Sequence, residues 1–264
     1  MKTFNKDLTF VICAYRKSPY LEECIRSCIH QNVQAKVILY TSTPNKYIEN
    51  LVNKYNLSYY IGRTKGIGAN WNEALGLVKT KYAVLAHHDD IYLPNYVEEL
   101  QKFMNRESNP IIFISDYEEF KDGKVVNPRT VNLKIKTRML WPLQRFSRSK
   151  WLRKRIFSFG SPICCPAVCY NLEKLNVWGF KFNEEMKVSL DWEAWYRMAE
   201  MDGSFCFINK ALVWHCIHQE SATTETIADN TRTREDLLMF EKYWPKFIAR
   251  FLMRFYVKSQ ETNQ

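Results

Sequence analysis

Residues 82–90 read YAVLAHHDD, a run of apolar residues that leads directly into two histidines and two aspartates. An uninterrupted apolar run with no polar alternation predicts a strand buried on both faces. Further strands are predicted at 8–15, 36–40, 57–61 and 111–115. Helical spacing of apolar residues predicts helices that begin near Ser18-Pro19 and cover about 46–55, 71–77 and 94–105. Strands that alternate with helices predict an α/β fold with a mostly parallel sheet.

Ligands of such sheets bind beyond the carboxyl ends of the strands, so Tyr15, Thr41 and Asp89 are expected to meet in one crevice. A carboxylate pair in that position suits a Mg²⁺ or Mn²⁺ ion bound to a diphosphate, because these ions prefer oxygen ligands. The alternative is that Asp89 and Asp90 only cap the helix that starts near Pro94. The dipeptide alone leaves both interpretations open.

The chain has 264 residues, of which 46% are apolar, and this is enough for a sizeable core and excludes intrinsic disorder. The apolar run near the N-terminus is too short for a signal peptide, and the longest uncharged stretch, 156–172, contains a glycine and two prolines. We therefore expect a protein that does not span a membrane. The eight cysteines include no CxxC pair, which favours reduced, buried thiols in a cytoplasmic protein.

The formal net charge of +10 predicts an anionic partner: nucleic acid, a membrane surface or a phosphorylated substrate. Residues 123–172 contain eleven Lys or Arg and no Asp or Glu, so the excess lies in one segment. That segment has no helix-turn-helix, zinc-finger or ribonucleoprotein signature, which argues against nucleic acid.

The C-terminal stretch combines cations with aromatic rings. Basic residues recur every four positions, at Lys242, Lys246, Arg250, Arg254 and Lys258, and leave a broad aromatic face. One interpretation is an amphipathic helix at the surface of an anionic membrane. The other is a helix docked on the core with its lysines in solvent.

Five segments carry a resemblance to a known family. They are 10–16 (FVICAYR), 66–75 (GIGANWNEAL), 85–94 (LAHHDDIYLP), 190–193 (LDWE) and 214–223 (WHCIHQESAT). In this order and spacing they resemble the family 2 glycosyltransferases, enzymes of the GT-A fold that use nucleotide-sugar donors. The segment 85–94 resembles the family's DXD motif.

The resemblance implies roles for individual residues. Asp89 would contact a Mn²⁺ or Mg²⁺ ion, and His218 would contact the metal or a phosphate. The chain departs from the family pattern at Thr41, where an aspartate commonly contacts the nucleobase, and at His87, which replaces the first Asp of the DXD motif. The expected donor-binding residues are Ala14, Tyr15, Arg16, Thr41, Arg63, Lys65, Asn72, His87 and Asp90.

Asp191 starts the helical stretch DWEAWYR, where an acidic residue is also a common N-cap. The resemblance favours a different role, that of the general base which deprotonates the acceptor hydroxyl. His215 is expected to be structural.

These observations predict a GT-A-type nucleotide-sugar-binding sheet flanked by helices, with a donor half (1–115), an acceptor-side half (116–230) and a helical, membrane-apposed tail (231–264). The expected function is metal-dependent, inverting sugar transfer to a saccharide acceptor, lipid-linked as in bacterial surface polysaccharide synthesis. The expected location is the cytoplasmic face of the cell membrane. The alternatives are a soluble sugar or protein acceptor, or a catalytically silent sugar-nucleotide binder. The sugar, the nucleobase and the linkage stay open.

Overall fold

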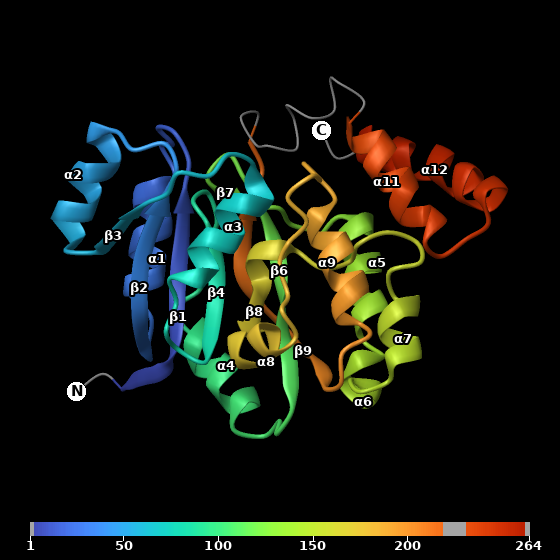
Figure 1. Ribbon diagram of the computed structural model, residues 1–264, viewed down its shortest axis with the longest axis horizontal. Coiled ribbons are helices and arrows are strands. Elements are labelled where there is room, and N and C mark those ends of the chain that lie inside the picture. Colours follow the sequence, from blue (N-terminus) through green and yellow to red (C-terminus); the bar gives the residue numbers. More distant parts are fainter. Residues whose placement is uncertain (1–2, 219–230, 262–264) are drawn as a thin grey trace.

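The computed structural model describes residues 3–218 and 231–261 (Figure 1). Its centre is a nine-stranded sheet in the order β3-β2-β1-β4-β8-β6-β9-β5, with β7 paired to β6. The strands are β1 (Phe4–Ala14), β2 (Gln34–Thr41), β3 (Ser58–Ile61), β4 (Tyr82–His87), β5 (Ile91–Tyr92), β6 (Pro110–Lys121), β7 (Lys124–Val125), β8 (Val168–Asn171) and β9 (Ser204–Cys216).

The first half has the predicted alternation of strands and helices. Strands β1 to β4 pair in parallel, and the predicted helices appear as α1 (Leu21–Ile29), α2 (Lys46–Tyr55), α3 (Ile67–Gly76) and α4 (Tyr96–Met104). Helix α2 begins where Asn45 Oδ1 accepts a hydrogen bond from the backbone N–H of Ile48 (3.1 Å). It ends at Asn56, which adopts the left-handed conformation that favours asparagine.

The second half of the sheet is mixed, so the prediction of a mostly parallel sheet holds only for the first half. Strand β8 lies antiparallel between β4 and β6, whereas β6 and β9 run parallel. The expected boundary at residue 115 falls inside β6, which runs from Pro110 to Lys121. One continuous sheet therefore passes through both predicted halves.

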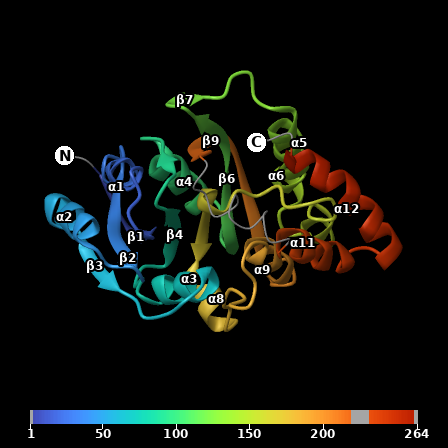
Figure 2. The same ribbon diagram turned by 90° about the horizontal axis from the view of Figure 1, so that it is seen from above.

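Helices cover both faces of the sheet (Figure 2). Helices α1, α2 and α4 bury their apolar residues on one face, and α3, α8 (Leu172–Val177) and α9 (Leu190–Met198) do so on the other. The basic segment forms α5 (Val131–Leu140), α6 (Leu143–Phe146) and α7 (Lys150–Arg155). Several of its cations are already neutralised, by the ion pairs Arg129–Asp116, Arg148–Glu107, Lys150–Asp202 and Lys154–Glu200.

The C-terminal helices α11 (Thr231–Glu241) and α12 (Lys246–Glu261) lie at the end of the molecule opposite to β3 (Figure 1). They pack on the core through buried residues that include Phe240, Ala249 and Met253. The ring of Phe240 meets that of Trp192 in α9 edge to face, with 5.1 Å between ring centroids. None of the helices in the described residues is both long and apolar enough to cross a bilayer. All eight cysteines are free thiols.

Candidate active site

Three neighbouring strands end together and bring the predicted donor residues to one edge of the sheet. In the parallel register Ala14 of β1 pairs with Thr41 of β2, and Cys13 of β1 pairs with His87 of β4. Beyond β4 the chain turns through His88, Asp89 and Asp90 before it enters β5. The carboxyl ends of β1, β2 and β4 therefore lie together, where the sequence predicted a crevice.

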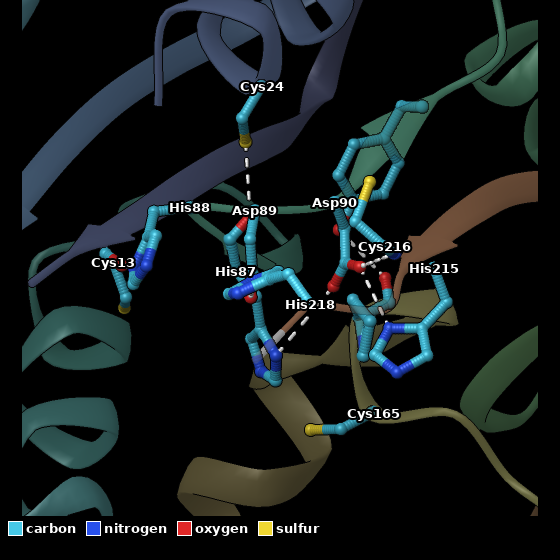
Figure 3. Close-up of polar contacts among 12 residues, drawn as sticks. Cys13, Cys24, His87, His88, Asp89, Asp90, Cys165, His215, Cys216 and His218 are labelled. Atoms are coloured by element: carbon cyan, nitrogen blue, oxygen red, sulfur yellow. Dashed lines mark hydrogen bonds and ion pairs between the residues drawn. The ribbon is translucent and has the colours of Figure 1, made fainter. Parts of the chain in front are cut away.

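Asp90 lies deepest in this turn and is fully buried. Its Oδ1 accepts a hydrogen bond from the backbone N–H of Cys216 (3.0 Å) and lies 2.8 Å from Nδ1 of His215 (Figure 3). Both partners belong to the end of β9, so Asp90 ties the β4–β5 turn to that strand. These contacts give Asp90 a role in supporting the loop, beside the donor contact expected from the resemblance, and they give His215 a structural partner.

Asp89 faces His218, which lies just beyond the end of β9. Nε2 of His218 is 2.9 Å from Oδ2 of Asp89, and the imidazole stacks on Tyr20 with 4.5 Å between centroids. Burial alone would raise the pKa of Asp89. The hydrogen bond from His218 and the charges of the nearby histidines lower this pKa by more, so the net shift is downward. Asp89 is therefore an ionised carboxylate that is partly exposed to solvent. Residues 219–223 of the fifth resembling segment lie outside the described residues.

The side chains of His87, Asp89 and Asp90 each offer one ligand atom, and these atoms lie within 4.8 Å of one another. Nε2 of His87 and Oδ2 of Asp90 are buried and have no hydrogen-bond partner in the described part of the chain. Burial lowers the pKa of His87, whose ring stacks on Trp71, so a neutral imidazole with a free lone pair is available. Oxygen and imidazole nitrogen donors fit Mn²⁺ or Mg²⁺. By contrast, His88 turns away toward the carbonyl of Cys13 (Figure 3).

The loops after β1 and β2 form the next wall of the crevice. Thr41 is buried, and its hydroxyl accepts a hydrogen bond from the backbone N–H of Thr43 (3.1 Å). The hydroxyl of Thr43 in turn accepts the N–H of Arg16 (2.6 Å). Arg16 adopts φ of 51°, which is uncommon outside glycine, and its guanidinium lies over the exposed ring of Tyr15. Thr41 thus holds the turn that presents Tyr15 and Arg16.

The loop between β3 and α3 carries Arg63 and Lys65, both exposed. A polar network absent from the sequence predictions fixes this loop. The hydroxyl of Tyr40 donates to Glu73 (2.8 Å), and the hydroxyl of Thr64 lies 2.9 Å from the same carboxylate oxygen. The sequence pattern gives no sign of this network, because its residues come from three separate elements: β2, the loop and α3.

Asn72 makes contacts that the sequence did not suggest. Its amide nitrogen donates to the carbonyl of Phe182 (3.0 Å) and to Glu184, and its amide oxygen accepts the N–H of Phe182 (2.7 Å). The side chain therefore holds residues 182–184 against α3. A contact of Asn72 with the donor stays a prediction.

Asp191 is the second residue of α9 and is half-buried. Its Oδ1 accepts a hydrogen bond from the N–H of Trp192 (2.6 Å). Burial raises the pKa of Asp191 to about 6, while that hydrogen bond and the charge of Arg232 act in the opposite direction. Burial raises the pKa of the Cys165 thiol, and the charges of Asp191 and Asp90 raise it further.

Curated relatives of the chain are glycosyltransferases. The chain is 23% identical over 239 residues to an uncharacterized glycosyltransferase of Rickettsia prowazekii, a match that covers 87% of this chain and 70% of the relative. It is 24% identical over 223 residues to an uncharacterized glycosyltransferase of Methanocaldococcus jannaschii, with coverages of 79% and 70%.

Solved structures share the fold at low sequence identity. The structure of S. aureus TarS 1-349 in complex with UDP-GlcNAc superposes with a TM-score of 0.68 at 14% identity and covers 93% of this chain and 70% of TarS 1-349. The mannosyltransferase PcManGT of Pyrobaculum calidifontis, in complex with GDP-Man and Mn²⁺, gives 0.64 at 12% identity, with coverages of 94% and 69%. The family model for glycosyl transferase family 2 matches residues 9–166. Because this match spans more than half of the chain, the protein belongs to glycosyl transferase family 2 and is a glycosyltransferase with the GT-A fold.

Proposed function

We propose that the protein transfers a sugar from a nucleoside diphosphate donor to a saccharide hydroxyl, with inversion at the anomeric carbon and with Mn²⁺ or Mg²⁺ as cofactor. The observation that carries the proposal is Asp191, whose pKa of about 6 suits a general base near neutral pH. It stands apart from a cluster of His87, Asp89 and Asp90 whose donor atoms suit a divalent cation. Two carboxylate sites with different tasks are what this reaction requires.

In the reaction, Asp191 accepts the proton of the acceptor hydroxyl while that oxygen forms a bond to the anomeric carbon. The bond from this carbon to the donor diphosphate breaks, and the electron pair leaves with the diphosphate. A divalent cation supplies charge neutralisation at the leaving diphosphate when it is bound. Asp89 and His87 would hold this cation, His218 keeps Asp89 oriented through its hydrogen bond, and Asp90 fixes the turn.

The donor would lie along the strand ends of residues 1–115, as proposed for the donor half. Structural neighbours support a nucleotide sugar, since TarS was solved with UDP-GlcNAc and PcManGT with GDP-Man and Mn²⁺. Arg16, Arg63 and Lys65 carry the positive charges that could meet the diphosphate. An open hollow of about 700 Å³ beside Arg16 and Asn45 leaves room for the nucleoside end.

The proposal is tested by measuring the free nucleoside diphosphate released from UDP-GlcNAc, UDP-Glc and GDP-Man. No acceptor is added, so that water takes the place of the acceptor hydroxyl. Turnover of at least one donor with Mn²⁺, and its loss in EDTA, is expected of the enzyme. A protein that binds a donor and never turns it over would instead be a sugar-nucleotide binder.

We also propose that the acceptor is lipid-linked, as in surface polysaccharide synthesis, and that residues 231–264 lie against the cytoplasmic face of the membrane. The support is the orientation of α12. Its buried side is formed by Ala249 and Met253, while Phe247, Phe251 and Phe255 are 74%, 57% and 60% exposed. A helix that only docked on the core would bury its phenylalanines, whereas α12 packs Tyr256 against Phe240 and leaves its three phenylalanines exposed.

Charge supports an anionic bilayer as the surface that α12 would meet. Lys246, Arg250 and Arg254 each directly precede one of the three phenylalanines, and residues 242–260 contain no Asp or Glu. In an interfacial helix, aromatic rings lie at the boundary of the acyl chains and cations contact the lipid headgroups. A second copy of the same face would bring these cations against one another.

Co-sedimentation with vesicles tests this surface. The full chain is expected to pellet with phosphatidylcholine vesicles that contain phosphatidylglycerol at low salt, and much less with phosphatidylcholine alone. Replacing Phe247, Phe251 and Phe255 together by Ser should reduce the bound fraction about tenfold or more, because three apolar side chains leave the interface.

The matched control replaces exposed apolar residues at other sites, Phe4, Ile61 and Val177, by Ser. This variant should bind as the wild type does. Absence of pelleting at low salt, equal loss in the control, or a self-association of the chain that the α12 variant abolishes would each contradict the membrane proposal.

A further inference from the structure

The N-terminus of α9 is capped by a carboxylate from α11. Glu235 is buried, and its two carboxylate oxygens accept hydrogen bonds from three consecutive backbone N–H groups, those of Lys187 (2.8 Å), Val188 (2.9 Å) and Ser189 (2.9 Å). The first turn of a helix and the residues before it leave N–H groups without partners, and a negative charge there also meets the positive end of the helix dipole. Glu235 meets this need from a different helix.

The next residue of α11 completes the arrangement. Oδ1 of Asp236 accepts a hydrogen bond from the hydroxyl of Ser189 (2.6 Å). Ser189 is the N-cap residue of α9, yet its side chain makes no capping bond to its own helix. A serine in this position ordinarily caps locally. Here the hydroxyl of Ser189 donates to α11 instead. Glu235 therefore binds the backbone N–H of this cap residue, and Asp236 binds its side chain.

Two residues after this cap comes Asp191. The same end of α9 is also held from α11 by the contact of Phe240 with Trp192 (5.1 Å between centroids). We propose that Glu235 and Asp236, together called the α11 latch, are positioning residues that set the place of the Asp191 carboxylate in the acceptor-side wall. This inference rests on the proposed function of Asp191 as base.

The cost of the arrangement supports a functional purpose. Two carboxylates buried on one helix lose hydration even though Arg232 pairs with Asp236 (3.7 Å between Nε and Oδ2), and a local cap by Ser189 would avoid this loss. The groups whose charges act on Asp191 are Arg232 and Asp236 of α11 and Lys136 of α5. Asp236 favours protonation of Asp191, and Arg232 and Lys136 oppose it. The latch therefore reaches the base both through the backbone and through charge.

Glu235→Gln tests the geometric part, with Glu241→Gln on the same helix as the matched control. A glutamine has one acceptor oxygen for three N–H groups, so hydrogen exchange at the amides of 187–189 should accelerate about tenfold or more. In acceptor-free hydrolysis, kcat should fall about tenfold while KM for the donor stays within twofold, because the base and not the donor site is displaced. Glu241→Gln should change neither.

Asp236→Asn tests the contribution of charge, because Asn can still accept the hydroxyl of Ser189. The acid limb of the pH profile of kcat should move to lower pH, as the neighbour that favours protonated Asp191 is gone. A merely structural residue would lower stability and leave this limb in place.

The latch and the proposed base can fail separately. If Asp191→Asn is inactive but Glu235→Gln matches Glu241→Gln in both turnover and amide exchange, the latch is wrong and the base assignment stands. If Asp191→Asn turns over normally, the proposed function of Asp191 is wrong, whatever the latch variants do. An unchanged acid limb in Asp236→Asn overturns the influence of charge on the base.

Discussion

Asp191→Asn is expected to lose about 10²- to 10⁴-fold in turnover, the contribution usual for a positioned general base. The substitution keeps the shape of the side chain and its amide oxygen, which can still accept the N–H of Trp192. Donor affinity should remain within about threefold of wild type, because Asp191 is proposed to act on the acceptor hydroxyl. Asp202→Asn is the control, since Asp202 is exposed and paired with Lys150 at the surface. Near-normal turnover of Asp191→Asn would contradict the assignment.

The same variant should be more stable than wild type at neutral pH. The folded state raises the pKa of Asp191 from 3.8 to about 6, so between these values the native protein binds more protons than the unfolded chain. Wild-type stability therefore falls as pH rises through this window, and the ionised form costs about 1–3 kcal/mol above it. Asp191→Asn avoids this cost. The midpoint temperature of its thermal unfolding should be higher than that of wild type at pH 7 and should approach the wild-type value below pH 4. A variant that is less stable than wild type at pH 7 would contradict the pKa shift.

Asp89→Asn is expected to lose about 10²-fold or more in Mn²⁺-dependent turnover, because a carboxylate proposed to hold the cation is replaced by a neutral amide. Its neighbour supplies the contrast. Asp90 is fully buried and accepts the N–H of Cys216, so Asp90→Asn should lower the free energy of unfolding by about 1–3 kcal/mol. Turnover and thermal unfolding of the two variants check this division. Equal turnover in Asp89→Asn and wild type would remove Asp89 from the proposed cation site.

Much of the donor half was predictable because its signals are local. Buried parallel strands leave apolar runs in the sequence, and the runs at 8–15, 36–40 and 82–86 became β1, β2 and β4. The rule on strand ends predicted that Tyr15, Thr41 and Asp89 meet. The strand register places Ala14 beside Thr41 and Cys13 beside His87, so the ends of β1, β2 and β4 lie together. Family membership, expected from five segments in order, is confirmed by the match to residues 9–166.

The remainder depends on pairings that a single sequence does not reveal. Strand β8 is only four residues long, and its insertion between β4 and β6 is decided by packing rather than by pattern. The hydrogen bonds of Asn72 were not predicted because its partner, the backbone of Phe182, lies 110 residues away. The buried acids Glu235 and Asp236 looked like ordinary polar residues of a helix. The basic segment suggested one charged surface, but Arg153 is buried and donates to the carbonyls of Met201 and Gly203.

Calorimetric titration of the wild-type protein with UDP-GlcNAc, UDP-Glc and GDP-Man, in Mn²⁺ and in EDTA, tests the central claim most directly. The claim is that the cluster after β4 holds a cation against the diphosphate of a nucleotide sugar. The predicted result is binding of at least one donor in Mn²⁺, weakened about tenfold or more in EDTA. Absence of binding by all three donors, or equal affinity in Mn²⁺ and EDTA, would contradict it.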